Sequence, residues 1–351
     1  MIKVKIIGAG GYGGCGLLEL LLRHPQAQVT GVIDIADVGK PIGTLLPHLK
    51  DYYTLPICAP DDPSNFTDVD VVFCATPDGV GMTLAQKFLD KGIKFIDFSG
   101  DFRFNNPADY AGYASRIGRD GSHASRHLLD SAVYGLAELH RQELKTTSLV
   151  GNPGCFATSC ILGMAPALKH RLIDSPTIIC DCKTGVSGAG KKPSPGFHYP
   201  ARYDSMNAYK LTGHQHVFEI KRELSIVGET DVNIVFTPQV VPMCRGILST
   251  LYATVKQGIT AETVMDAYSN FYQDEPFIRL FSSNDTVMTS SIRGTNFCYL
   301  TIKVDESCSS LLVVSHIDNL MKGQAGSAIQ AMNVMFDVPE TQGLNLPAQY
   351  P

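Results

Sequence analysis

Cys155 is the residue in this chain whose setting most favours chemistry. It follows the turn Gly-Asn-Pro-Gly at residues 151–154 and precedes an apolar run that is typical of a helix. Backbone N–H groups at a helix N-terminus, together with the positive end of the helix dipole, favour the thiolate form of a cysteine. We therefore predict that Cys155 is a nucleophile, against the alternative that it is a small buried apolar side chain.

An acid/base group is the second requirement of such chemistry, and two imidazoles offer it. His214 and His216 lie in a polar loop before a helical pattern. Side chains two positions apart on an extended loop point in opposite directions, so one of the two is expected to face the thiol. A His-x-His pair is also a metal-binding pattern, but no carboxylate or third histidine stands at a ligand spacing, so no metal is predicted.

A glycine-rich turn near the N-terminus indicates a dinucleotide site. The sequence there is Gly8-Ala9-Gly10-Gly11-Tyr12-Gly13. This turn has the Gly-x-Gly-x-x-Gly spacing between a strand pattern and a helix pattern, as dinucleotide-binding folds require. The glycines permit a tight turn and a close approach of the pyrophosphate, whose charge the helix N-terminus receives.

The residues after the second strand pattern bear on the choice of dinucleotide. Asp34 ends that strand pattern, where an acid hydrogen-bonds an adenosine ribose and disfavours a 2′-phosphate, which points to NAD. Lys40, shortly downstream, would instead attract the 2′-phosphate of NADP. Both residues are also readily explained as solvated loop charges, so the pattern leaves NAD and NADP open.

Three further places are candidates for holding an anionic group. Ser187 and Gly188 belong to a second glycine-rich loop, residues 185–192, which offers backbone N–H groups and lysines but lacks the P-loop pattern. The alternative for this stretch is an ordinary flexible loop. Arg103 at the end of a strand pattern and Arg245 at the start of another could each clamp an anion or form a structural ion pair.

Two different patterns of secondary structure along the chain indicate two domains. The first third alternates short apolar strands with helices, which predicts a doubly wound parallel (Rossmann) sheet in a dinucleotide-binding domain. The strands are expected at 3–7, 29–34, 69–74 and 94–97, and the helices at 13–24 and 80–89. After Cys155 longer strands alternate apolar and polar residues, which predicts an α+β domain with a mixed or antiparallel sheet. These strands are expected at 177–183, 232–239, 247–255, 297–304 and 309–316.

The expected domain boundaries follow from this change in the pattern of secondary structure. Residues 1–150 form the dinucleotide-binding domain, to which a C-terminal helical stretch at about 318–340 is added. Residues 151–317 form the catalytic, substrate and oligomerisation domain.

The bulk composition excludes several classes of protein. The 351 residues suffice for about two domains, and 44% apolar with 18% charged residues is typical of a folded globular protein. The net charge is −5 and no basic stripe is present, so no nucleic-acid partner is predicted. No apolar run approaches the ~20 residues of a membrane span, and no leader pattern is visible. The ten cysteines show no Cys-x-x-Cys pair, which favours reduced thiols and a cytoplasmic location.

With these residues assembled, the chain resembles the N-acetyl-γ-glutamyl-phosphate reductases of arginine biosynthesis, which are related to the aspartate-semialdehyde dehydrogenases. The resemblance runs nearly end to end. The matching stretches are residues 8–13, 97–103, 134–139, 151–159, 185–190, 214–220, 241–246 and 318–323.

The resemblance implies roles for individual residues. The cysteine matching Cys155 is the family's nucleophile, and a histidine of the His-x-His motif is its acid/base, for which we favour His216 over His214. Ser187, Gly188 and Lys322 would line the nicotinamide side of the cofactor site. Asn152 is expected to help stabilise the oxyanion, and a homodimer or homotetramer is expected.

The resemblance also implies the reaction. Thiolate attack on an acyl phosphate leaves a thioester, which the cofactor reduces to a semialdehyde. The resemblance implies NADP as the cofactor. NAD stays the alternative, because Asp34 stands where the family usually has a small polar or basic residue. A second departure is the Thr-Pro-Asp-Gly of residues 76–79, which replaces the family's Pro-His-Gly and is expected to alter the cofactor loop. The substrate side chain stays open, with carrier-linked aminoadipyl phosphate and aspartyl phosphate as alternatives. A non-catalytic dinucleotide-binding sensor is the alternative from another class.

Overall fold

The computed structural model describes residues 1–174 and 177–350. The described residues divide into two compact units. The first unit comprises Met1–Pro153 and Gln324–Leu346, and the second comprises Gly154–Gly323 and the last few residues.

A parallel sheet forms the centre of the first unit. Its seven strands lie in the order β3-β2-β1-β4-β5-β7-β6, and every neighbouring pair is parallel. The strands are β1 (Ile2–Ile7), β2 (Ala27–Ile33), β3 (Ile57–Cys58), β4 (Val71–Cys74), β5 (Lys94–Asp97), β6 (Val133–Tyr134) and β7 (Leu149–Gly151). The predicted doubly wound fold is confirmed. All four residues of β4 are buried, which explains why this strand is a continuous apolar run in the sequence.

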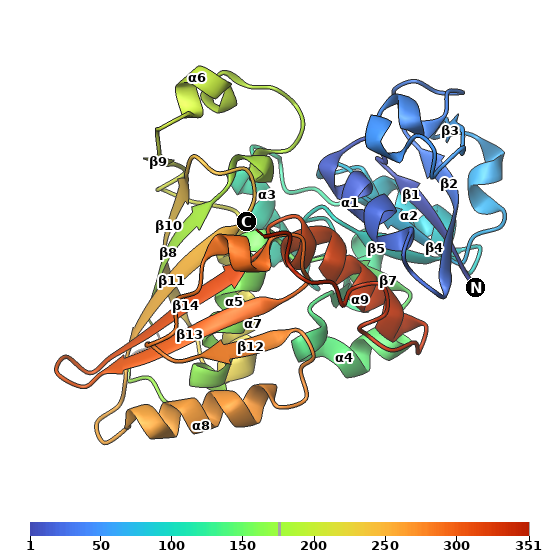
Figure 1. Ribbon diagram of the computed structural model, residues 1–351. Coiled ribbons are helices and arrows are strands. Elements are labelled where there is room, and N and C mark those ends of the chain that lie inside the picture. The colour runs from blue at the N-terminus through green and yellow to red at the C-terminus, as the bar shows by residue number, and fades with distance from the viewer. Residues whose placement is uncertain (175–176, 351) are drawn as a thin grey trace. The chain divides into compact units, whose positions relative to one another are not determined.

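Helices complete the first unit. They are α1 (Tyr12–Leu21), α2 (Gly81–Leu89), α3 (Pro107–Arg116), α4 (Ala137–Thr146) and α9 (Gly326–Met335). All ten residues of α9 are buried, and this late segment of the chain packs on α4 and α1, as the red helix of Figure 1 shows. The helical stretch predicted at about 318–340 is an α-helix only over Gly326–Met335, and Met321–Ala325 before it form a π-helical turn.

A second sheet of seven strands forms the centre of the second unit. Its order is β12-β13-β14-β11-β8-β10-β9. The strands are β8 (Thr177–Thr184), β9 (Asn207–Ala208), β10 (Asn233–Val240), β11 (Ile247–Thr254), β12 (Ile278–Phe281), β13 (Cys298–Asp305) and β14 (Ser310–Ile317). The sheet is mixed, since β8 pairs in parallel with β10 and β12 with β13, whereas the other pairs are antiparallel. Alternating burial reports that one face is covered and does not report strand direction.

Helices cover one face of the second sheet. They are α5 (Cys155–Lys169), α7 (His216–Gly228) and α8 (Ala261–Tyr272), and the short α6 (Tyr199–Arg202) lies outside that layer (Figure 1). Every residue of α5 from Phe156 to Leu168 is buried, and the helix packs on β11, β14, α7 and α8. This central position holds the first residue of α5 firmly in place. Within the described residues no helix combines the length and the apolar character that a membrane crossing needs.

Candidate active site

Cys155 is the first residue of α5. Its N-cap, Gly154, has extended φ/ψ values (−72°, 145°) and makes no side-chain cap. The thiol therefore stands at the positive end of a fifteen-residue helix, in the setting that lowers the cost of a thiolate. Gly323 lies against it, since a Cβ on Gly323 would be 2.7 Å from the Cβ of Cys155.

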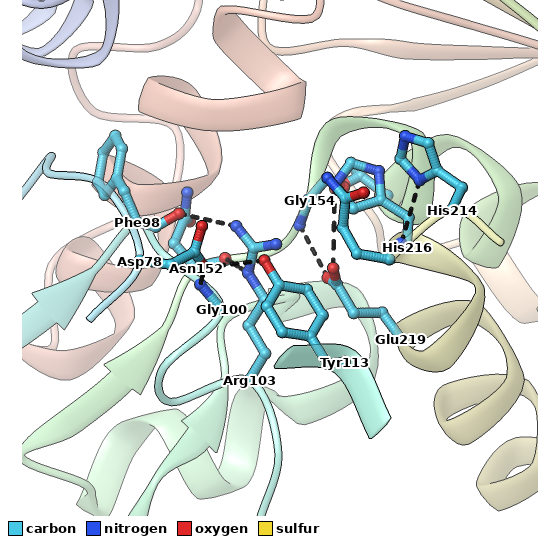
Figure 2. Close-up of polar contacts among 12 residues, drawn as sticks. Asp78, Phe98, Gly100, Arg103, Tyr113, Asn152, Gly154, His214, His216 and Glu219 are labelled. Atoms are coloured by element: carbon cyan, nitrogen blue, oxygen red, sulfur yellow. Dashed lines mark hydrogen bonds and ion pairs between the residues drawn. The ribbon is translucent and has the colours of Figure 1, made fainter. Parts of the chain in front are cut away.

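His216 is the first residue of α7 and is held beside the turn that leads into Cys155. A Cβ on Gly154 would lie 2.5 Å from His216 Nε2, so the imidazole packs directly on the Cα of Gly154. Glu219, one turn further along α7, has its Oε1 4.0 Å from His216 Nε2, and its Oε2 accepts the Gly154 N–H at 2.9 Å (Figure 2). One buried carboxylate thus joins the N-termini of α5 and α7 and positions the imidazole.

His214 is buried behind His216 in an aromatic setting. Its Nδ1 accepts the backbone N–H of His216 at 3.1 Å, and its ring makes edge-on contacts with Phe156 and His216. Burial, followed by the charges of His216 and Lys210, lowers the pKa of His214 to about 2. The imidazole of His214 therefore stays neutral near neutral pH, and this supports the preference for His216 as the acid/base.

The glycine-rich turn of the first unit has the geometry of a dinucleotide loop. Gly8 has φ +79°, and a Cβ there would lie 2.4 Å from the carbonyl oxygen of Ala75. Gly11 is the N-cap of α1 and makes no side-chain cap, while Tyr12 is exposed on the first turn. Gly13 packs on Phe98, with 3.2 Å between its ideal Cβ position and the ring. These residues fit a pyrophosphate at the start of α1.

Asp34 hydrogen-bonds the glycine-rich turn itself. Its Oδ2 accepts the N–H of Gly10 at 2.9 Å, and its Oδ1 accepts the N–H groups of Ile35 and Ala36 at 2.8 and 3.2 Å. Lys40 forms an ion pair with Asp37, with 2.7 Å between Nζ and Oδ1. The carboxylate of Asp34 thus places a negative charge beside Gly10, whereas the charge of Lys40 is partly satisfied by its neighbour.

Arg103 and Asn152 lie at the carboxyl ends of β5 and β7. Arg103 is buried, and its Nε and Nη2 donate to the carbonyl oxygens of Asn152 and Phe98, each at 2.7 Å (Figure 2). These bonds give Arg103 a structural role as a donor to backbone carbonyl oxygens, and its binding of an anion stays a prediction. The side-chain Nδ2 of Asn152 donates to the Gln324 carbonyl at 3.0 Å, and its buried Oδ1 has no hydrogen-bond partner among the described residues.

Arg245 is engaged in an ion pair within the second unit. Its Nη2 lies 2.9 Å from Asp318 Oδ2, and its Nε donates to Asp318 Oδ1 at 3.3 Å. Asp318 is fully buried and also accepts the Gly294 N–H at 2.7 Å. The structure thus favours a structural ion pair for Arg245, and its binding of substrate stays a prediction.

The second glycine-rich loop meets the segment that carries Lys322. Ser187, in the 3-10 turn Val186–Ala189, accepts a hydrogen bond of 2.9 Å from Asn319 Nδ2. Gly188 faces Thr184 and Asn319, and Lys322 is fully buried with its Nζ 5.7 Å from the centre of the Phe277 ring. The loop is therefore anchored by a side chain from the later segment, which the flexible-loop alternative does not provide.

Glu219 and Asn319 are the residues that the sequence analysis missed. A carboxylate at i+3 from His216 on a helix is a signal that points to an ion pair with the imidazole. No local signal identifies Asn319, because its partners, Ser187 and Gly246, come from distant parts of the chain.

Two family descriptions match most of the chain. Residues 3–147 match the semialdehyde dehydrogenase NAD binding domain, and residues 155–319 match the semialdehyde dehydrogenase dimerisation domain. An N-acetyl-gamma-glutamyl-phosphate reductase of Geobacter metallireducens is 41% identical over 98% of both chains. A protein of the same name from Brevibacillus brevis is 39% identical over the full length of both.

Solved structures share the fold at low sequence identity. Aspartate semialdehyde dehydrogenase II of Vibrio cholerae, complexed with ASA, has a TM-score of 0.73 and 16% identity, covering 96% of this chain and 98% of its own. Aspartate semialdehyde dehydrogenase of Candida albicans with NADP has a TM-score of 0.69 and 14% identity, covering 96% and 98%.

Proposed function

The chain belongs to the N-acetyl-γ-glutamyl-phosphate reductases of the semialdehyde dehydrogenase family, and we propose that Cys155 and His216 carry out their reaction in it. The reaction reduces N-acetyl-γ-glutamyl phosphate to N-acetylglutamate 5-semialdehyde, releases phosphate and serves arginine biosynthesis. The observation that carries the assignment of roles is the packing of His216 on Gly154, directly before the thiol at the start of α5.

The first half of the reaction is acyl transfer to the thiol. His216 takes the proton of the Cys155 thiol, and the helix N-terminus stabilises the resulting thiolate, which attacks the acyl carbon. The tetrahedral intermediate expels phosphate, which receives that proton from His216, and a thioester to Cys155 remains. Glu219 acts as a positioning residue, since it contacts Gly154 and His216 and takes no part in these proton transfers.

The second half of the reaction is reduction. The chemistry that a nicotinamide cofactor would supply when bound is a hydride for the thioester carbon. The alkoxide form of the thiohemiacetal on Cys155 then collapses to the aldehyde as its carbon–sulfur bond breaks, which returns the thiolate, and His216 can deliver a proton from solvent to that thiolate. Covalent attachment holds the acyl carbon in place for the hydride, which is the advantage of orientation over a bimolecular encounter.

We propose NADP as the cofactor, with NAD as the alternative. Gly8, Gly10, Gly11, Gly13 and the N-terminus of α1 would hold the pyrophosphate, while Ser187, Gly188 and Lys322 would line the nicotinamide side. The Candida albicans relative with NADP supports this choice. The charge of Asp34 beside Gly10 is the feature that favours NAD.

We also propose a homodimer or homotetramer that forms through the second sheet. Helices cover one face of this sheet, whereas the other face exposes apolar side chains on three neighbouring strands. These side chains are Ile179 on β8, Val235 on β10 and Tyr252 on β11. An exposed apolar patch of this kind is typical of a protein–protein interface, and the matching domain is described as a dimerisation domain. The cytoplasm as the site of the reaction stays a prediction.

The reverse reaction tests the proposal most simply. The protein is incubated with N-acetylglutamate semialdehyde, phosphate and either NADP or NAD, and reduced nicotinamide is followed by absorbance. We expect reduction with the intact protein and none with Cys155→Ala. Aspartate semialdehyde as the preferred substrate would move the assignment to another acyl phosphate. No signal with either cofactor would leave a dinucleotide-binding sensor as the better explanation.

A further inference from the structure

A second cluster of potential ligands lies in the first unit, outside every residue used above. Cys15 and Glu19 are one helical turn apart on α1, and His48 comes from the 3-10 turn Pro47–Leu49 in the connection between β2 and β3. The Sγ of Cys15 lies 3.6 Å from Glu19 Oε1 and 3.6 Å from His48 Nε2, and the latter two atoms are 3.0 Å apart. Among the described residues these three form a group whose ligand atoms all lie within 4.8 Å of one another.

The triangle of ligand atoms has the size of one face of a zinc tetrahedron. Zinc–ligand bonds are about 2.3 Å to sulfur and about 2.0–2.2 Å to nitrogen and oxygen. In a tetrahedron these bond lengths place a sulfur roughly 3.6 Å from a neighbouring nitrogen or oxygen, and a nitrogen roughly 3.4 Å from an oxygen. The two sulfur distances agree with these values, and the nitrogen–oxygen distance needs to lengthen by only a few tenths of an ångström. The three donor atoms therefore already lie close to the positions that a zinc ion needs.

The donor set indicates which ion fits. Thiolate, imidazole and carboxylate are together the ligands of Zn²⁺, whereas Mg²⁺ and Ca²⁺ prefer oxygen alone. We propose that Cys15, Glu19 and His48 form a binding site for Zn²⁺, with a water molecule as the fourth ligand. The site is partly exposed, so ions and water reach it from solvent.

The position of the site gives a bound ion a structural consequence. The ion joins α1 to the segment that contains His48, and Leu45 of the same segment lies 2.9 Å from the ideal Cβ position of Gly10. A bound zinc ion would therefore link α1 to the segment of Leu45 and His48, and both of these elements lie beside the glycine-rich turn. The alternative is a hydrogen-bonded surface cluster, in which Glu19 pairs with His48 and the thiol of Cys15 donates to the carboxylate.

Metal binding by the whole protein separates these alternatives. Because Cys155 could also bind zinc, the parent for the test carries Cys155→Ala, and Zn²⁺ is titrated against a chromophoric chelator. We expect one Zn²⁺ per chain. Cys15→Ser, Glu19→Gln and His48→Gln should each weaken binding at least as much as the roughly 10–100-fold that loss of an outer-shell partner costs.

Two controls show whether a loss of zinc binding comes from misfolding or from the removal of any other thiol. Cys58→Ser changes a second partly exposed cysteine of the same unit and should leave the affinity within about threefold of the parent. In Co²⁺-loaded protein, the thiolate-to-cobalt charge-transfer band should be present in the parent and absent in Cys15→Ser, with unchanged metal-free melting temperatures. Absence of stoichiometric zinc binding in the parent, or equal binding by Cys15→Ser and Cys58→Ser, would overturn the proposal.

Discussion

Replacing Gly154 by alanine probes the arrangement of Cys155 and His216 without touching either side chain. The backbone of Gly154 (φ −72°, ψ 145°) suits alanine, so the substitution causes no backbone strain. The new Cβ would lie 2.5 Å from His216 Nε2 and 3.0 Å from Glu219 Oε1. Carbon atoms do not approach heavy atoms this closely, so the imidazole must move away from the turn that carries the thiol.

The expected loss of activity exceeds the expected loss of stability. Gly→Ala gains about 0.4–1 kcal/mol through the unfolded state, and the overpacking costs about 1–3 kcal/mol, so the net destabilisation is at most about 2.6 kcal/mol. Displacing the acid/base group removes a factor of about 10²–10⁴ from kcat, equivalent to about 2.7–5.4 kcal/mol in the barrier. The assay is reduction of NADP by N-acetylglutamate semialdehyde and phosphate, with melting temperature measured alongside.

Gly196→Ala is the matched control. Gly196 belongs to the same unit, and beyond its chain neighbours no atom of the described residues lies within 4 Å of its ideal Cβ position. The Gly196→Ala protein should keep kcat within about threefold of the unmodified protein. A folded Gly154→Ala protein with kcat in that same range would refute the placement of His216 as the acid/base.

Three further predictions follow from individual contacts. Burial lowers the pKa of His214 to about 2 in the folded protein, whereas the imidazole of the unfolded chain titrates near 6.5. The unfolded chain therefore takes up a proton as the pH falls and the folded protein does not, so the free energy of unfolding drops by about 2.3 kcal/mol from pH 6.5 to 4.5. Urea unfolding should show this loss in the parent and not in His214→Gln. Gly323→Ala places a Cβ 2.7 Å from that of Cys155 and should lower kcat by about tenfold or more in the same assay, with little change in the KM for NADP. Asp34→Asn removes the negative charge beside Gly10 and should raise the ratio of kcat/KM for NADP to that for NAD by about tenfold, or ~1.4 kcal/mol, which lies within the ~1–4 kcal/mol expected for unit charges at about 4 Å; an unchanged ratio would remove Asp34 from cofactor selection.

Local patterns were sufficient for the elements that carry the chemistry. The buried strands of the first sheet are short apolar runs, and the turn before Cys155 marks the start of α5 because glycine and proline interrupt the strand pattern there. The parallel pairing of β8 with β10 was not predictable from alternation, since α7 supplies the crossover between them and was recognised only as a helical segment.

The details of the candidate site depend on contacts between distant residues. Glu219 joins α7 to Gly154, and this pairing exists only when the two helices pack side by side. Arg103 and Arg245 could be anion clamps or structural residues from sequence alone, and only their partners, two carbonyl oxygens and Asp318, favour the structural alternative. The neutral state of His214 likewise could not be predicted from the sequence, because it depends on the burial of the imidazole by residues distant in the chain.

The central claim is that Cys155 carries the acyl group, and trapping that acyl group tests it most directly. The protein is mixed with N-acetyl-γ-glutamyl phosphate in the absence of dinucleotide, quenched in acid, and analysed for released phosphate and for intact mass. We predict a burst of one phosphate per active site and an N-acetylglutamyl adduct that maps to Cys155 and is absent from Cys155→Ala. A protein that turns over with NADP but shows neither burst nor adduct, or whose adduct persists in Cys155→Ala, would contradict the account.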